Sequence, residues 1–212
     1  MQLTNEEVRI LGCLIEKKLT TPEYYPLTVN KLMYACNQKN NRFPLTDYTE
    51  ELIEIALEKM RDKGLVTRVT GHGIKTPKYR ENFSEVYNFS EAKQAIIAEL
   101  FLRGIQTPGE LNSRASRMCQ FSGLGEVNQI LDELINLETG AAVVKLPKLG
   151  SAERFFHTFS DLPPSNQTEK SETVIDNSVT SQLLSEIKTL REEVQLLKGE
   201  IDEIKIFIEQ FK

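Results

Sequence analysis

Ile105-Gln106-Thr107-Pro108-Gly109-Glu110-Leu111 repeats an earlier run of the 212-residue chain, Leu19-Thr20-Thr21-Pro22-Glu23. An amphipathic helix pattern leads into each run, over Glu6–Leu19 and over Glu91–Leu102. Thr21 and Thr107 are 86 residues apart (107 − 21), about the length of one small domain. The repeat predicts two copies of a small helical unit, which is typical of a tandem binding module rather than of one catalytic core.

The first copy carries signals for three helices followed by two strands. The capping box Thr4-x-x-Glu7 opens the first helix. A second helix fits Thr28–Cys36, and a third fits Thr49–Lys63, where Gly64 suits the position just after the helix end. We expect the third helix to be buried through Leu52, Ile55, Ala56 and Met60. Strands are then predicted on both sides of a glycine turn, at Leu65–Thr70 and Thr76–Arg80.

The second copy repeats this order. Ser90 opens its first helix, and Thr107-Pro108-Gly109-Glu110 combines three signals for the start of a second helix that runs to about Met118. A third helix fits Leu124–Leu137, and strands are predicted at Ala142–Leu146 and Arg154–Phe159. The predicted fold is therefore mostly α with small β wings (α+β): two tandem winged helix-turn-helix domains, over residues 1–83 and 84–160.

The remaining residues divide into a linker and a heptad repeat. Residues 161–178 are polar, contain Pro163-Pro164, and predict a flexible linker. Residues 179–212 repeat apolar residues with a period of 3.5, and Glu at each g position faces Lys or Arg at the matching e position. This pattern favours a parallel homodimeric coiled coil; an amphipathic helix that folds back on the domains is the alternative. The predicted dimer contacts are Leu183, Ile187, Leu190, Val194, Leu197, Ile201, Ile204 and Ile208.

Three stretches of the chain carry a resemblance to a known family. They are residues 11–27, from Leu11-Gly12-Cys13 to Tyr25-Pro26-Leu27, residues 35–42, Ala35-Cys36-Asn37-Gln38-Lys39-Asn40-Asn41-Arg42, and residues 102–111. On these motifs the chain resembles the YceH-like proteins, bacterial proteins of uncharacterised function. Family members often have Ser where Asn40 stands and Pro where Ile105 stands. The resemblance implies two winged-helix domains over residues 1–160, and it implies no activity and no site residues.

Charge is distributed unevenly along the chain, whose formal net charge is −5. The only strongly basic stretch runs from residue 59 to residue 80, where seven Lys and Arg accompany one Asp: Lys59, Arg61, Lys63, Arg68, Lys75, Lys78 and Arg80. Basic residues on a wing can contact the phosphates of duplex DNA, so these seven are the candidate nucleic-acid-binding residues of a possible transcriptional regulator.

The predicted third helices argue against reading of bases in the major groove. Asp47, Glu50, Glu51 and Glu54 begin the first of them, and Glu126, Asp132 and Glu133 lie in the second. Carboxylates repel phosphates, so base recognition by these helices is not expected. A solvated charged surface and a protein–protein scaffold built on the acidic helices and the coiled coil remain as alternatives to DNA binding.

Four smaller features remain, and the first two of them are open to two interpretations. Asn37–Arg42 either contacts phosphate or a partner, or is a polar turn that caps backbone groups, which we favour. Tyr24-Tyr25 is either a partner anchor or a cover for the connector. Arg114 and Arg117 are interpreted as a solvated face. His72 and His157 have no partners at metal-ligand spacing.

Other function classes find no support in the sequence. Cys13, Cys36 and Cys119 form no Cys-x-x-Cys pair, and we expect the first two to be buried free thiols. We find no signal peptide, no apolar run near the roughly 20 residues that span a bilayer, and no catalytic constellation. The sequence thus predicts a cytoplasmic, non-enzymatic binding protein without metal or cofactor.

Overall fold

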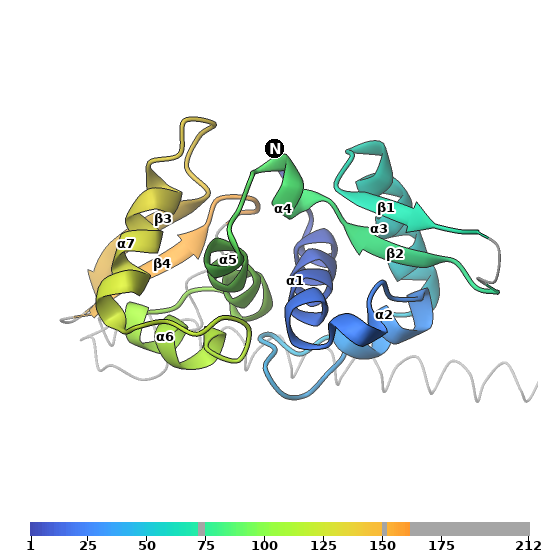
Figure 1. Ribbon diagram of the computed structural model, residues 1–212, viewed down its shortest axis with the longest axis horizontal. Helices are drawn as coiled ribbons and strands as arrows, with labels where there is room; N and C mark the ends of the chain where they lie inside the picture. The colour runs from blue at the N-terminus through green and yellow to red at the C-terminus, as the bar shows by residue number, and fades with distance from the viewer. Residues whose placement is uncertain (72–74, 150–151, 162–212) are drawn as a thin grey trace, which may run out of the picture. The chain divides into compact units, whose positions relative to one another are not determined.

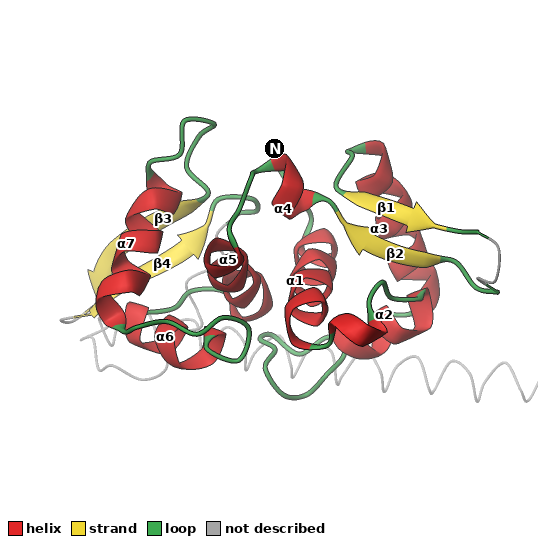
Figure 2. Ribbon diagram, viewed as in Figure 1, coloured by secondary structure: helices red, strands yellow, loops and turns green. Residues whose placement is uncertain are grey.

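The protein is described by a computed structural model that covers residues 1–71, 75–149 and 152–161. Within these residues, helices and two small antiparallel hairpins alternate twice along the chain (Figure 1; Figure 2). The first half contains α1 (Asn5–Thr20), the 3₁₀ turn η1 (Pro22–Tyr24), α2 (Val29–Cys36), α3 (Glu50–Asp62), β1 (Val66–Val69) and β2 (Lys78–Glu81). The second contains α4 (Phe83–Val86), α5 (Glu91–Arg103), α6 (Pro108–Ala115), α7 (Leu124–Ile135), β3 (Val143–Leu149) and β4 (Ala152–His157).

Most helix starts follow from the capping residues of the sequence. Thr4 and Thr107 each form a capping box, with Glu7 and Glu110 respectively. The side chains of Thr28, Thr49 and Ser90 accept hydrogen bonds from the backbone N–H groups of the first turns of α2, α3 and α5. These caps satisfy amide groups that a helix start leaves without partners, which is why those boundaries could be predicted closely.

The structural counterpart of Thr107 in the first half is Thr28, whereas the sequence repeat suggests Thr21. Thr107 caps α6, whereas Thr21 precedes only the short turn η1, and Thr28 caps α2. The residue before each true cap pairs with the second strand of its hairpin: Leu27 with Tyr79, and Gln106 with Phe155. The structural repeat is therefore 79 residues (107 − 28), and η1 is an insertion in the first half.

The core of the two halves is continuous because α1 packs against α5, with the hairpins to either side of this pair (Figure 1). Every residue of α1 from Glu7 to Glu16 is buried, and so is every residue of α5 from Gln94 to Leu102. A Cβ added at Gly12 would lie 2.9 Å from the Cβ of Phe101, so glycine permits the close approach of these helices. The described residues all belong to one compact unit.

Helix α4 was not predicted from the sequence, although it anchors an aromatic cluster. Phe83 is fully buried, and its ring lies 4.7 Å from the ring of Tyr87 and 5.0 Å from that of Phe159. The N–H of Leu3 donates to the carbonyl of Phe159 at 2.7 Å. The beginning and the end of the described chain therefore meet around this turn.

The predicted buried face of α3 was wrong in part. Ile53 and Leu57 are fully buried together with Ala56 and Met60, whereas Ile55 is 59% exposed and Leu52 is half-buried. The cap at Thr49 fixes where the helix starts, and the packing against α1 and α2 then selects the stripe one residue away from the predicted one.

Two further predictions concern residues beyond this region. The linker of residues 161–178 lies outside the described residues except for Asp161, and the heptad segment 179–212 lies entirely outside them. Among the helices that the structure describes, none is long and apolar enough to cross a membrane.

Candidate nucleic-acid interface

The seven basic residues chosen from the sequence lie on two neighbouring elements, the end of α3 and the β1–β2 hairpin. Helix α3 ends at Asp62, and Gly64, with a φ of +72°, lets the chain turn directly into β1. Lys59 and Arg61 lie in the last turn of α3, followed by Lys63 at its cap, and Arg68 lies in β1. Lys75 precedes β2, and Lys78 and Arg80 lie within it.

Three of the seven side chains are held by carboxylates of the protein itself. The Nζ of Lys63 lies 2.7 Å from both carboxylate oxygens of Glu7, which is almost fully buried. Arg80 pairs with Glu85 at 2.9 Å. Arg61 pairs with Glu58 one turn back in α3. Part of the positive charge predicted for phosphate contact is therefore neutralised within the fold.

The other four, Lys59, Arg68, Lys75 and Lys78, form no ion pair with any described residue. We call these four the cationic hairpin surface. Lys59, Arg68 and Lys75 are exposed, and Lys78 is half-buried. Arg68 faces Tyr79 in the strand register and Lys78 faces Val69, so they project from opposite faces of the hairpin. Positive charge thus surrounds the hairpin instead of covering one face of it.

Helix α3 presents a negative surface next to this positive one. Glu51, Glu54 and Glu58 are exposed along the helix. Hydrogen bonds from its own backbone N–H and from Thr49 lower the pKa of Glu51, so its carboxylate is ionised at neutral pH. The amide of Asn30 donates to Glu50 at 2.6 Å and ties the start of α3 to α2. Base reading through α3 remains unfavourable on electrostatic grounds.

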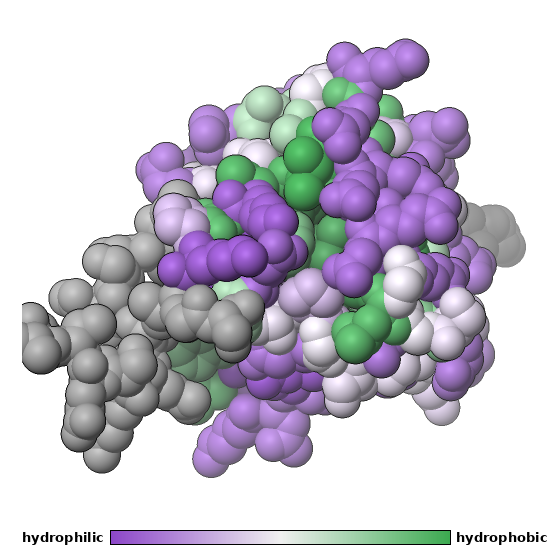
Figure 3. Space-filling model, turned by 90° about the vertical axis from the view of Figure 1, so that its left-hand side faces the viewer, coloured by the Kyte–Doolittle hydropathy of each residue, from purple (hydrophilic) through white to green (hydrophobic). Residues whose placement is uncertain are grey.

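The described residues of the second half form a weaker cationic hairpin, in which Arg154 is the one cation without an ion pair to a described residue. In the β3–β4 hairpin, Lys145 and Lys148 both lie near the carboxylate of Glu153, at 2.7 Å and 3.6 Å. On α7, Glu133 is paired with Lys93 of α5 at 2.9 Å. Seen from this side, polar residues cover most of the surface and hydrophobic residues form separate small areas (Figure 3).

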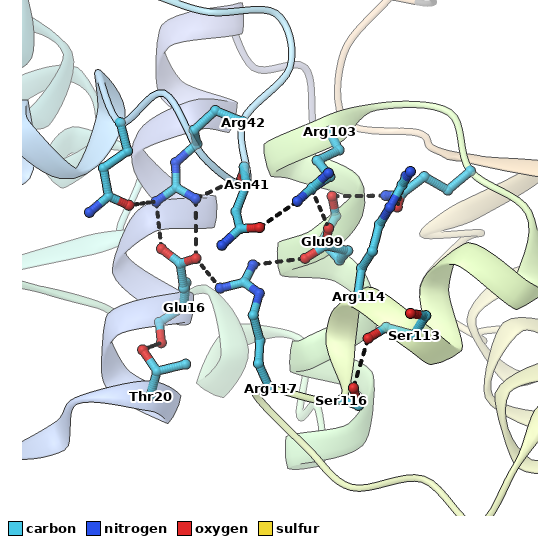
Figure 4. A network of polar contacts seen from close by, with 12 residues as sticks. Glu16, Thr20, Asn41, Arg42, Glu99, Arg103, Ser113, Arg114, Ser116 and Arg117 are labelled. Carbon is cyan, nitrogen blue, oxygen red and sulfur yellow. Dashed lines mark hydrogen bonds and ion pairs between the residues drawn. The ribbon is translucent and has the colours of Figure 1, made fainter.

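A network of ion pairs joins the two halves at the α1–α5 contact (Figure 4). The carboxylate of Glu16 binds both Arg42, at 2.5 Å and 3.1 Å, and Arg117. Arg117 also reaches Glu99 at 2.8 Å, and Glu99 lies 2.9 Å from Arg103. The interpretation of Arg117 as part of a solvated face was therefore wrong, because it bridges a carboxylate of α1 and a carboxylate of α5.

The electrostatics of this network favour the charged forms. Burial acts to raise the pKa of Glu16, but hydrogen bonds and charges from Arg42 and Arg117 outweigh it and hold this pKa below its ordinary value. Arg114 lies at the edge, where it donates to Gln106 at 3.0 Å and pairs with Glu110 at 3.1 Å. The network is an internal structural element that neither half completes alone.

The Asn37–Arg42 segment is largely the backbone-capping turn that the sequence favoured. The side-chain oxygen of Asn37 accepts from the N–H of Tyr48, and its amide donates to the carbonyl of the same residue, both at 2.8 Å. Asn41 has a φ of +60° and accepts from Arg103. Arg42 is buried, so the alternative in which its guanidinium contacts phosphate was wrong.

The two tyrosines of the connector have different environments. Tyr25 is half-buried, and its hydroxyl accepts from the N–H of Glu81 at 2.6 Å, as expected for a residue that covers the connector. Burial is the main reason that its pKa lies above the ordinary value. Tyr24, in contrast, is 60% exposed.

The cysteines and histidines of the described residues form neither a disulfide nor a metal site. Cys13 and Cys36 are buried free thiols, as predicted, and Cys119 is partly exposed. Burial and the adjacent Cys13 raise the pKa of Cys36 well above its ordinary value, which keeps this thiol protonated. Within the described ranges, no three His, Cys, Asp or Glu side chains could together hold a metal ion. His157 is 3% exposed, and burial lowers its pKa to about 3.

The described residues thus form a small α+β protein, in which two helix–hairpin halves are joined by a buried polar network and one hairpin carries the cationic surface. The chain belongs to the family described as "Protein of unknown function, DUF480", whose model matches residues 3–152. It is similar to UPF0502 protein Ent638_1581 of Enterobacter sp. (strain 638), with 42% identity over 211 residues that cover 96% of each chain.

Proposed function

We propose that this protein is a non-enzymatic, tandem winged-helix protein that associates with DNA and acts as a transcriptional regulator. In each half, the third helix and the hairpin would correspond to the recognition helix and the wing of that fold. The contact is made through the first wing, because the acidic face of α3 opposes entry into the major groove.

The observation that carries this proposal is the cationic hairpin surface. Four cations, at the end of α3 and on the first hairpin, form no ion pair with a described residue, whereas in the other hairpin both lysines share one carboxylate and only Arg154 has no such pair. Cations that are already paired lose an internal partner when they bind phosphate, whereas free ones exchange only water and counterions. Binding would therefore depend strongly on salt and weakly on sequence.

A salt series with random duplex DNA tests the proposal. In the full chain, the triple variant Arg68→Ala, Lys75→Ala and Lys78→Ala is expected to bind much more weakly at low salt. The plot of log K against log salt has a negative slope, and its magnitude should decrease by about three, at roughly 0.9 for each lost phosphate contact.

The matched control removes three positive charges from the other hairpin, by Lys145→Ala, Lys148→Ala and Arg154→Ala. This variant has the same net charge as the first one and should lose far less affinity, because two of its three cations are already paired and only Arg154 is not paired with a described residue. Equal losses in both variants, or no binding by the wild type at low salt, would refute the proposal.

We further propose that the protein is a parallel homodimer through the heptad residues 179–212. A dimer presents two cationic hairpins, so one DNA molecule can hold both and the apparent affinity rises without new contacts. Sedimentation of the full chain and of a chain ending at residue 178 tests this. A full-length monomer at micromolar concentration contradicts it.

One observation supports a second function, a protein-interaction scaffold. Ile55 is 59% exposed among the carboxylates of Glu51, Glu54 and Glu58, a composition suited to a basic partner with an apolar contact. Charge reversal at Glu51 and Glu54 should then abolish capture of a protein partner, while DNA binding should not weaken, because these carboxylates repel phosphates. If every captured partner remains after the reversal, this function is excluded.

A further inference from the structure

Two tyrosines of the first half lie on its surface and are far more exposed than Tyr79, which belongs to the core. Tyr24, in η1, is 60% exposed, and Tyr34, in α2, is 65% exposed, whereas Tyr79 is 5% exposed. Each tyrosine therefore presents a large ring surface to solvent, and the fold gains little from burying either of them. Neither ring belongs to the aromatic cluster around Phe83.

Lys31 lies beside the Tyr24 ring and on the same helix as Tyr34. Its Nζ is 5.4 Å from the centre of the Tyr24 ring, within the range of a cation–π contact. Tyr34 is three residues further along α2, and residues at this spacing are neighbours on a helix surface. Lys31 is exposed and forms no ion pair with a described residue, so its charge is available beside the Tyr24 ring.

Backbone hydrogen bonds attach this surface to the hairpin. The N–H of Leu27 donates to the carbonyl of Tyr79 at 3.1 Å, and the N–H of Tyr79 donates back at 2.7 Å. This antiparallel bridge places Thr28, the cap of α2, across from Lys78 of β2. The segment between η1 and α2, which separates Tyr24 from Lys31 and Tyr34, is therefore attached to β2, the strand that carries Lys78.

Exposed rings beside cations are the arrangement by which proteins hold single strands. Bases of a single strand stack on aromatic rings, and lysines neutralise the phosphates between them. A regular duplex cannot offer its base faces, and the acidic α3 opposes its approach by the major groove. An acidic peptide would satisfy the lysines but would leave the two rings without stacking partners.

We propose that Tyr24 and Tyr34 form a stacking platform for unpaired nucleobases of a single strand, whose phosphates are contacted by Lys31 and Lys78. The inference rests on the proposed function, since the same hairpin supplies part of the charge, and it adds the class of nucleic acid. Glu23, next to Tyr24, is an exposed carboxylate on this surface and weakens the binding.

The test uses the full chain with labelled 15-nucleotide single strands, oligo-dT and oligo-rU, and with a duplex of 15 base pairs. Tyr24→Leu with Tyr34→Leu keeps apolar bulk and removes both rings, and it is expected to weaken single-strand binding roughly tenfold or more. Tyr24→Phe with Tyr34→Phe keeps the rings and should bind like the wild type. Duplex binding should be the same in all three proteins.

The result that overturns the platform is single-strand affinity that is equal in the leucine and phenylalanine variants. Duplex binding that depends on Lys75 and Lys78, together with no single-strand binding, also overturns it and leaves the proposed function intact. If the wild type binds neither the duplex nor the single strands, the proposed function itself is refuted. Stronger binding of oligo-dT or of oligo-rU decides between DNA and RNA, and either preference supports the platform.

Discussion

The β1–β2 and β3–β4 hairpins hold the same place in the two halves and differ in how their cations are used. Both follow a third helix, and both pair with the residue before the cap of the second helix. In the first hairpin, Arg68 and Lys78 form no ion pair with a described residue. In the second, Lys145 and Lys148 share Glu153, and Arg154 alone forms no ion pair with a described residue.

The buried ends of the second strands differ as well. Glu81 in β2 occupies the position of His157 in β4, counted from the bridges at Tyr79 and Phe155. Glu81 is paired with Lys18 at 2.8 Å, whereas the Nδ1 of His157 has no hydrogen-bond partner among the described residues. A repeated fold therefore does not imply a repeated function, and the charges left free by each half are the better guide.

The largest expected effect is on stability, and it tests whether the two halves unfold together or as separate units. Glu16→Ala removes the carboxylate that binds Arg42 and Arg117, and it leaves the buried Arg42 guanidinium without its anionic partner. Breaking a buried ion pair in this way costs about 3 to 5 kcal/mol of unfolding free energy. Thermal unfolding followed by circular dichroism should show one transition at a much lower temperature.

The control for this variant is Glu58→Ala, which removes an exposed ion pair on α3 and should lower the stability far less. Two transitions in the Glu16→Ala variant, one of them unchanged from the wild type, would show that the halves unfold independently. The α1–α5 network would then not join them energetically.

The order of elements was predictable because each signal is local. Capping residues such as Thr49 and Thr107, the glycine after α3 and the alternation of helix and strand patterns act within a few residues. For the same reason the basic stretch from Lys59 to Arg80 was found, and its residues lie at the end of α3 and on the β1–β2 hairpin. DNA binding by that hairpin stays a prediction.

The network between the halves could not be predicted in this way. Four residues of the network are far apart in the sequence, and each is of a charged type that usually lies on the surface: Glu16, Arg42, Glu99 and Arg117. Only the packing of α1 on α5 buries them together. A signal did exist: the family resemblance rests on three stretches, residues 11–27, 35–42 and 102–111, and these supply Glu16, Arg42 and Arg103.

The next effect sharpens the contrast between Glu81 and His157. Because burial lowers the pKa of His157 to about 3 in the folded state, the unfolded chain, with an ordinary pKa near 6.5, binds a proton first as the pH falls. Stability is therefore complete above about pH 6.5 and is lost as the pH falls toward 3. Between pH 7.5 and pH 5.5 the loss should be on the order of 1 kcal/mol, measurable by urea unfolding.

His157→Phe is the matched variant, since it keeps a ring beside Phe101 and Phe156 and removes the titrating group. Its unfolding free energy should change much less over the same pH range. An equal loss in wild type and variant would assign the pH dependence to other groups.

The smallest effect converts the second hairpin toward the first. Hydrogen bonding from Lys145 is the main cause that lowers the pKa of Glu153, so this carboxylate is charged at neutral pH and neutralises Lys145 and Lys148. Glu153→Gln keeps the shape and frees both lysines, and it should raise the affinity for random duplex DNA by roughly twofold to tenfold at low salt. Glu138→Gln, which makes the same change of net charge without freeing a lysine, serves as the control in the same anisotropy titration. Equal gains in the two variants would mean that net charge, rather than the pairing of individual lysines, distinguishes the two hairpins.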